Sequence, residues 1–131
     1  MFPKEVESIQ RLLREVVSLL VAKEWDKLCR IVPGWRDNSE GILEQLDLFP
    51  FELVLPPEEA FQAVSYEDTL ILPTGWEFPC LEIIKVTDSE WCIDYFLWTE
   101  EEGMSELALR LSFVQDGGVM KVKSFDDLLV P

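Results

Sequence analysis

Apolar and polar residues alternate almost strictly between residues 91 and 125, and this alternation limits the fold more than any other feature. A period of two puts successive side chains on opposite faces of a strand, so one face of each strand is buried. Two turn sequences, Glu100–Met104 and Asp116-Gly117, divide the segment into three strands. A fourth strand, at about Leu81–Thr87, is expected to join them through a turn at Asp88-Ser89. The sequence therefore predicts an antiparallel meander with one apolar face.

The turn sequences also predict how the strands pair, because a slip of one residue would exchange the two faces of a strand. Asp116-Gly117 is a preferred two-residue hairpin turn, in which both central residues have positive φ. With these two residues in the loop, Phe113 is expected opposite Met120, and Leu111 opposite Val122. Apolar side chains would then share one face.

The hairpin through Glu100–Met104 is aligned in the same way. Thr99 is expected opposite Ser105, which matches apolar residues along both strands and puts Asp94 opposite Arg110. An ordinary cross-strand ion pair, worth well under ~1 kcal/mol, is one interpretation of that pairing. Burial of Asp94 without a partner is the other interpretation, and it would make this residue a weak candidate for a catalytic base.

The second face of the sheet is expected to mix charged and apolar residues. A turn at Asp88-Ser89 would put Ile84 opposite Ile93, and Lys85 beside Cys92 on this second face. The other side chains assigned to it are Asp94, Phe96, Trp98, Ala108, Arg110, Lys121, Lys123 and Phe125. Four cations would make the face locally basic. A solvated face is the simpler interpretation, whereas its aromatic residues favour a binding or homodimer surface.

Helices are expected before the sheet. Residues 3–23 carry an apolar stripe at helical spacing, and residues 24–32 form a second stretch that either continues the first or follows a bend. A capping serine predicts a third helix at 39–48. Three short elements are also predicted: a strand or linker at Phe51–Leu55, a helix from Pro56 through Val64, and a strand at Thr69–Leu72. This order predicts an α+β fold with the N-terminal helices packed on the apolar face of the sheet.

Composition places the chain among small acidic globular domains. Its 131 residues suit a single domain over 1–131, and a chain of this length buries roughly two-thirds of its unfolded surface. The chain has 26 acidic and 11 basic residues, which give a net charge of −15. A field of that sign repels phosphate groups, so binding to nucleic acid or to an anionic membrane is not expected. The same charge suits a basic protein partner.

The residue types that usually carry catalysis or bind metals are scarce. No histidine is present, which removes the commonest general base and the commonest metal ligand. The three cysteines, Cys29, Cys80 and Cys92, are widely spaced and suit reduced, buried thiols in a cytoplasmic protein. Neither a metal site nor a cofactor is predicted. Charged residues interrupt any apolar leader, and no apolar run reaches the ~20 residues of a membrane span.

The order of elements resembles that of the cystatin-like and nuclear-transport-factor-like folds. In those folds a sheet curves around a long N-terminal helix and often encloses a pocket, which the resemblance implies here. The stretch Leu97–Leu109 resembles the motif LWTxEEGxSxLxL of small uncharacterised bacterial proteins. Met104 stands where that motif more often has a basic residue, so an arginine-dependent role of the loop is not expected.

These observations lead to two hypotheses about function. The first is a non-enzymatic, cytoplasmic binding protein of bacterial type, such as an immunity-type protein that neutralises a basic toxin. The acidic turn formed by Glu100, Glu101 and Glu102 would dock that partner, although a solvated hairpin tip is the simpler interpretation. The second hypothesis is a small-molecule pocket protein, or a lyase or isomerase of the cone-like class. Its candidate residues are Asp94 and Tyr95, which lie on opposite faces of their strand.

Overall fold

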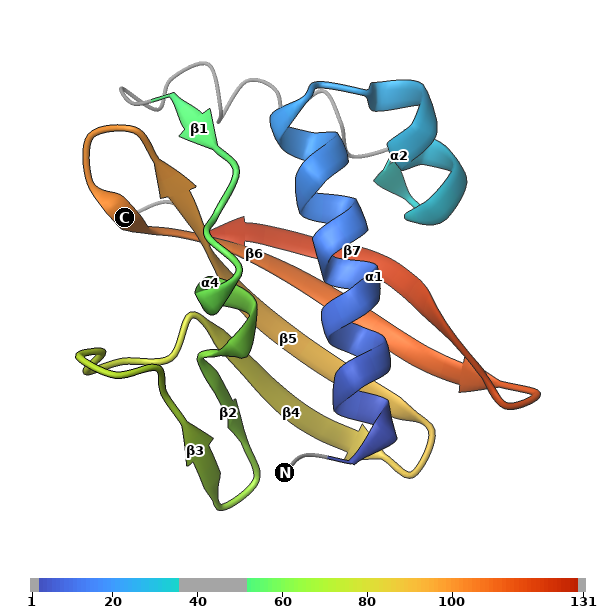
Figure 1. Ribbon diagram of the computed structural model, residues 1–131. Helices are drawn as coiled ribbons and strands as arrows, with labels where there is room; N and C mark the ends of the chain where they lie inside the picture. Colours follow the sequence, from blue (N-terminus) through green and yellow to red (C-terminus); the bar gives the residue numbers. More distant parts are fainter. Residues whose placement is uncertain (1–2, 36–51, 130–131) are drawn as a thin grey trace.

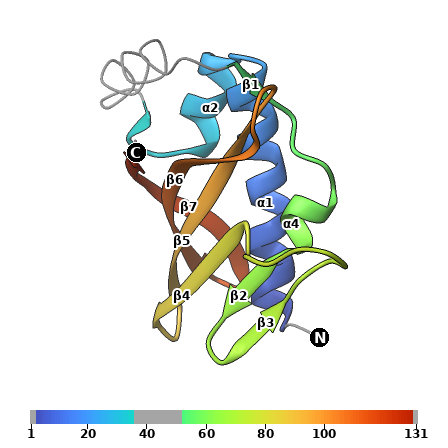
Figure 2. The same cartoon turned by 90° about the vertical axis from the view of Figure 1, so that its left-hand side faces the viewer.

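The computed structural model describes residues 3–35 and 52–129, and within them helices pack against one face of a curved sheet (Figure 1). The elements described, in chain order, are α1 (Lys4–Val21), α2 (Trp25–Ile31), β1 (Leu53–Val54), α4 (Glu59–Gln62), β2 (Val64–Tyr66), β3 (Thr69–Ile71), β4 (Leu81–Thr87), β5 (Glu90–Thr99), β6 (Gly103–Asp116) and β7 (Val119–Leu129). The view turned by 90° shows α1 along one side of the sheet (Figure 2). This is the α+β arrangement that the sequence predicts. The helix expected at 39–48 lies outside the described residues.

Local interactions define both ends of helix α1. Glu5 and Glu7 lie in its first turn, where the positive end of the helix dipole favours acidic side chains. At its end Lys23 adopts a positive φ of 59°, and the N–H of Glu24 donates to the carbonyl of Leu19 at 2.9 Å. This is the Schellman arrangement that closes a helix. The chain therefore bends, and α2 is a separate helix.

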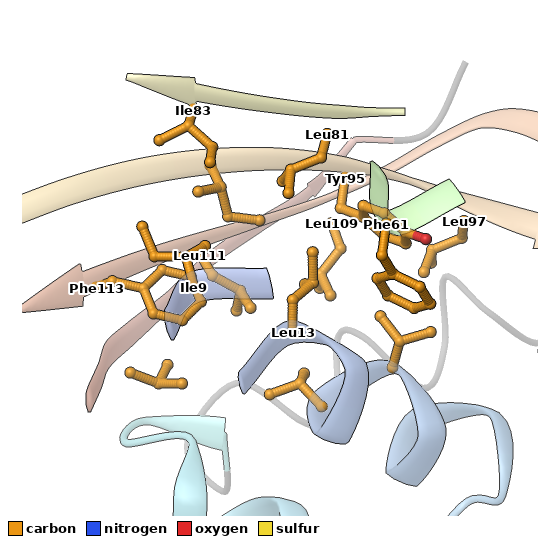
Figure 3. Close-up of a cluster of buried hydrophobic side chains, with 14 of the residues drawn as sticks. Ile9, Leu13, Phe61, Leu81, Ile83, Tyr95, Leu97, Leu109, Leu111 and Phe113 are labelled. Carbon is orange, nitrogen blue, oxygen red and sulfur yellow. The ribbon is translucent and has the colours of Figure 1, made fainter. Parts of the chain in front are cut away.

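The apolar stripe of α1 forms the helix side of the core. Its buried side chains are Val6, Ile9, Leu13, Val16, Val17 and Leu20. Figure 3 shows Ile9 and Leu13 beneath side chains that β6 directs toward the helix, including Leu109 and Leu111. Each fully buried aliphatic side chain contributes about 2 kcal/mol to folding, so this stripe holds α1 on the sheet.

The single turn of α4 contacts both α1 and the sheet, and Gln10 of α1 donates to the carbonyl of Phe61. Phe61 stacks on Tyr95 of β5, with ring centroids 5.2 Å apart and planes within 10° of parallel. Arg14 of α1 lies over the Phe61 ring at 5.3 Å and forms an ion pair with Glu58. The predicted helix ends earlier than expected, because Val64 belongs to strand β2. Aromatic packing therefore joins α1, α4 and β5.

The sheet is mixed, with the strand order β3-β2-β4-β5-β6-β7, and β1 pairs with the end of β5. Strand β2 runs parallel to β4, whereas the other pairs are antiparallel. The pairing of β2 with β4 covers Leu81–Ile83 only. Residues 84–87 of β4 therefore extend past β2 along the sheet.

The pairing of β5 with β6 confirms most of the predicted register. The expected partners are opposite each other over Glu90–Phe96, and Asp94 lies opposite Arg110. Toward the hairpin, Thr99 pairs with Gly103, two positions away from the expected partner. The turn holds three residues rather than five, because Gly103 supplies a positive φ of 72° that lets β6 begin early.

The register predicted for β6 and β7 is wrong by two residues. Asp116 pairs with Val119, so the hairpin turn is Gly117-Gly118. Both glycines have positive φ, 59° and 81°, which a two-residue hairpin turn needs and which glycine adopts without steric cost. A shift of two keeps the faces of both strands, and Phe113 lies opposite Val122.

The register predicted for β4 and β5 is wrong by one residue. The turn is Asp88-Ser89 as expected, but Val86 is an extra residue in β4 that has no partner of its own. This bulge changes the alternation, so Ile83 lies opposite Ile93 and Ile84 moves to the outer side. The apolar face of β4 is therefore formed by Leu81 and Ile83, which are buried. The uninterrupted pattern indicates Ile84 and Val86 instead.

Two further bulges in β7 decide where Phe125 lies. Lys123 and Asp126 are skipped in the pairing with β6, and Phe125 lies opposite Leu111. The expectation that Phe125 belongs to the second face is therefore wrong. Its side chain is buried in the core, and its ring meets that of Trp35 edge-on with centroids 5.5 Å apart.

Candidate functional site

The sheet face opposite α1 holds most of the residues that the sequence singled out, and it is called the outer face below. No helix of the described ranges covers it (Figure 2). The strand registers place one row of side chains across it: Leu70, Ser65, Glu82, Asp94, Arg110 and Asp127. Four of these six residues are charged, and one of the four is a cation. A predominantly acidic strip therefore crosses the outer face.

Asp94 and Arg110 form a bidentate ion pair in this strip. Arg110 Nε donates to Asp94 Oδ1 at 2.7 Å, and Nη2 donates to Oδ2 at 3.0 Å. These bonds to Asp94 raise the pKa of the Arg110 guanidinium above its ordinary value, so the group stays cationic. Both carboxylate oxygens of Asp94 are therefore occupied by bonds from Arg110. The pair therefore suits Asp94 to a structural role better than to general-base catalysis.

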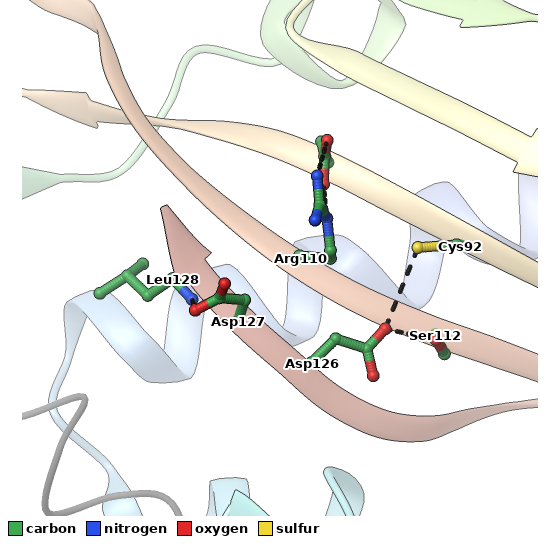
Figure 4. A network of polar contacts seen from close by, with 7 residues as sticks. Cys92, Arg110, Ser112, Asp126, Asp127 and Leu128 are labelled. Atoms are coloured by element: carbon green, nitrogen blue, oxygen red, sulfur yellow. Dashed lines mark hydrogen bonds and ion pairs between the residues drawn. The ribbon is translucent and has the colours of Figure 1, made fainter. Parts of the chain in front are cut away.

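A polar cluster surrounds Asp126, the bulged residue of β7 (Figure 4). The Ser112 hydroxyl donates to Asp126 Oδ2, and the Ser124 hydroxyl donates to Oδ1 at 2.7 Å. Cys92 Sγ lies 4.0 Å from Oδ2. Burial raises the pKa of the Cys92 thiol, and the negative charges of Asp126 and Asp94 raise it further. The thiol is therefore protonated at neutral pH and is a poor nucleophile.

The outer face is not locally basic, contrary to the expectation from the sequence. Lys121 and Lys123 each have an acidic partner, with nitrogen–oxygen distances of 3.9 and 3.0 Å. Lys85 lies opposite Trp91, on the helix side of the sheet, because the Val86 bulge shifts the register. The cations expected on this face are therefore either paired with carboxylates or located on the other side.

Carboxylates on the outer face outnumber the cations that neutralise them. Glu82, Asp126 and Asp127 take part in none of the ion pairs formed by the described residues. Asp127 Oδ1 accepts a hydrogen bond from the N–H of Leu128 at 2.8 Å, which leaves its charge in place. The face therefore carries part of the net charge of −15 without compensation.

Aromatic residues form a pocket at the end of β5, called the aromatic pocket below. The rings of Trp98 and Trp76 lie with centroids 5.8 Å apart and planes inclined by 40°. The volume of the pocket is about 270 Å³, and it is lined by Gly75, Trp76, Glu77, Phe78, Trp98 and Met104. Phe96 lies in the neighbouring row, opposite Ala108. The predicted grouping of Phe96, Trp98 and Phe125 does not form, because Phe125 is in the core.

The acidic turn follows directly after the strand that carries Trp98. Glu100, Glu101 and Glu102 form the three-residue connection between β5 and β6, and all three are exposed. The N–H of Glu102 donates to the hydroxyl of Thr99 at 3.1 Å, which helps to hold the turn. The exposure of these three glutamates agrees both with a solvated hairpin tip and with a turn that docks a basic partner.

A second hollow, called the edge groove below, follows the part of β4 that extends past β2. It is open to solvent, has a volume of about 870 Å³, and is lined by residues 82–88 together with Ser65 and Glu67. Ile84 and Val86 in this groove are 63% and 60% exposed. Neither β2 nor β3 pairs with this part of β4. Such a sheet edge accepts an additional strand from another chain.

Tyr95 lies on the helix side of the sheet, so it does not share a cavity with Asp94. It is fully buried beneath Phe61, and its hydroxyl has no hydrogen-bond partner among residues 3–35 and 52–129. Burial raises the pKa of this hydroxyl above its ordinary value. The described residues also contain no group of three or more cysteine and acidic side chains placed to hold a metal ion.

Sequence reasoning missed both the edge groove and the aromatic pocket. The edge groove depends on the bulge at Val86, which no turn residue or break in composition indicates. The aromatic pocket had a visible signal, because Trp76 and Phe78 lie in a short loop bounded by glycine and proline. The sequence did not indicate that this loop folds back over Trp98.

The similarity of this chain to known proteins is at the level of a family. No curated protein and no solved structure matches the chain. The resemblance to cystatin-like and nuclear-transport-factor-like folds therefore stays a prediction. No helix in the described part of the chain is long and apolar enough to cross a membrane. A family model described as a domain of unknown function, DUF7668, matches residues 17–131, which are most of the chain. The chain therefore belongs to the DUF7668 family.

Proposed function

We propose that this protein is a non-enzymatic, cytoplasmic binding protein whose outer face docks an extended segment of a basic protein. The observation that carries the proposal is the edge groove. Ile84 and Val86 in its lining are both more than half exposed, and the lining also contains Glu67, Glu82 and an Asp88 that pairs with Lys85. A partner strand with alternating apolar and basic side chains matches both features.

The backbone of β4 supplies the other half of this interaction. Residues 84–87 lie beyond the pairing with β2, so among residues 3–35 and 52–129 no strand pairs with them on that side, and a further strand can be added there. Strand addition gains main-chain hydrogen bonds, while alternate side chains provide specificity. A strand that enters beside β4 would bring its side chains against Ile84 on the outer face.

Electrostatics decide which kind of partner fits. A second copy of this chain carries the same charge of −15, so repulsion opposes a homodimer through this face. A basic partner gains attraction from Glu82, Asp126 and Asp127, which no described cation pairs with. Neutralisation of a basic toxin, as by an immunity-type protein of bacteria, is the form of this function that we favour.

A charge-reversal comparison tests the proposal. Cell extract would be passed over the wild-type protein, over Glu82→Lys in the groove, and over Glu15→Lys on the exposed side of α1 as a matched control. Circular dichroism would first establish that all three fold alike. We expect basic proteins to be retained by the wild type and by Glu15→Lys, and to be lost with Glu82→Lys.

The association rate of a retained partner then gives the quantitative test. Electrostatic steering makes the rate fall steeply with ionic strength. We expect at least a tenfold decrease between ~20 mM and ~500 mM salt. A rate that does not depend on salt, or equal retention by Glu82→Lys and the wild type, would contradict docking in the groove.

A further inference from the structure

We propose that the aromatic pocket binds the side chain of an arginine that the basic partner presents. This inference rests on the proposed function, because it names the chemical group by which the outer face recognises a basic segment. Trp76 and Trp98 form two walls of the pocket, inclined by 40° to each other. Phe78, which is 65% exposed, adds a third aromatic side chain, and Glu77 adds a carboxylate.

The walls have the chemistry that a cation needs. The face of an indole ring carries negative electrostatic potential, and tryptophan is the best of the aromatic residues for binding a cation. The guanidinium group is planar and weakly hydrated, so it stacks on a ring more readily than a compact ammonium does. Met104 contributes a polarisable thioether to the same lining. An arginine side chain therefore fits this set of groups better than a lysine.

The Trp98 wall is held in place before any ligand arrives. Its indole N–H donates to Cys80 Sγ at 3.4 Å, and the Cys80 thiol donates to the carbonyl of Phe96 at 3.2 Å. Gly103, whose φ of 72° favours glycine, also lies beside the ring, since a Cβ atom there would contact it at 3.4 Å. A ring fixed in this way loses little freedom on binding, which favours affinity.

Charge around the pocket favours a cation over a neutral or anionic group. Glu77 lies in the lining, and Glu100–Glu102 begin two positions after Trp98. None of these four carboxylates takes part in an ion pair of the described residues. An anion would be repelled, and a neutral side chain would gain only the contact with the rings.

A peptide titration separates these cases. The probes are acetyl-Gly-Gly-Arg-Gly-Gly-amide and the same peptide with citrulline, which keeps the planar shape of arginine but has no charge. Binding is read from the indole N–H resonances of the five tryptophans in a ¹⁵N-labelled protein. We expect the arginine peptide to shift the resonances of Trp76 and Trp98, and to leave those of Trp25, Trp35 and Trp91 unchanged.

Separate experiments then remove the charge of the ligand, the carboxylate of the pocket and one of its aromatic rings. Loss of the cation–π attraction should make the citrulline peptide bind about 3- to 30-fold more weakly. Glu77→Gln should weaken the arginine peptide several-fold, whereas Glu15→Gln on α1 should have no effect. Trp76→Leu should abolish the selectivity for arginine over citrulline. Should Trp76→Leu fail to fold, Glu77→Gln and the citrulline peptide still decide the question.

The outcomes separate this inference from the proposed function. Equal binding of the two peptides, or the absence of any shift at Trp76 and Trp98, would overturn the arginine pocket. Salt-dependent retention of a basic partner would then still support docking in the edge groove. Selective binding of the arginine peptide without retention of any basic protein would support the pocket and remove the proposed partner.

Discussion

Replacing Phe125 by alanine tests the least expected feature of the fold. The uninterrupted alternation of β7 puts this ring on the outer face, where its removal would have little effect on stability. The bulges at Lys123 and Asp126 instead turn it into the core, against Trp35. The two placements therefore predict clearly different losses of unfolding free energy when the ring is removed.

The expected cost follows from the surroundings of the ring. Phe125 is 8% exposed and meets the Trp35 ring edge-on at 5.5 Å. Removal of a buried phenylalanine side chain costs about 3–5 kcal/mol, and the lower end applies because this site lies at the margin of the core. We therefore expect Phe125→Ala to lower the free energy of unfolding by about 3 kcal/mol.

Urea denaturation followed by circular dichroism measures this loss. With an m-value of ~2 kcal/mol/M, the midpoint should fall by ~1.5 M. Phe78→Ala is the matched control, because the same group is deleted where the side chain is 65% exposed. It should cost less than ~1 kcal/mol. A loss for Phe125→Ala no greater than that for Phe78→Ala would refute the bulged register of β7.

Two further predictions concern the ion pair and the buried thiol. In a double-mutant cycle of Asp94→Asn and Arg110→Gln, we expect a coupling free energy of ~1 kcal/mol. The coupling should decrease in 1 M salt, because the side chains of Asp94 and Arg110 are 21% and 39% exposed. A coupling of zero would contradict the bidentate pair. Burial raises the pKa of the Cys80 thiol from its ordinary value of 9.0 to about 11, so the unfolded chain releases this proton first as pH rises. The contribution of Cys80 to stability is therefore fully present below pH 9 and decreases as the pH rises through 11, by roughly 3 kcal/mol relative to Cys80→Val. Parallel pH profiles of the two proteins would disprove this.

The sequence predicted those parts of the fold that follow from local periodicity. The helical stripe of α1 and the alternation of β5 are direct consequences of 3.6- and 2-residue periods, and both are present. The pairing of Asp94 with Arg110 could also be predicted, because β5 and β6 are long and tolerate only one alignment of their apolar residues. The position of the acidic turn at Glu100–Glu102 could be predicted because it interrupts that alternation of apolar residues. The length of the loop could not be predicted.

Strand β2 was not predicted, because three residues carry too little periodicity to be recognised. Val64 and Tyr66 are buried through parallel pairing with β4, which lies 15 or more residues later in the chain. A local pattern contains no information about such a pairing, since the main-chain hydrogen bonds come from a distant segment. The predicted helix was therefore extended two residues past its end at Gln62.

The sequence by itself determined which elements form and which face of the long strands is apolar, because these depend on residues only a few positions apart. The tertiary structure alone decided the bulges at Val86, Lys123 and Asp126, and with them the side on which Ile84 and Phe125 lie. A bulge disrupts local pairing and is stabilised by the packing it permits between distant residues, such as Phe125 and Trp35. Both candidate binding hollows depend on such long-range packing, so the groups that make them were visible in the sequence, but their assembly was not.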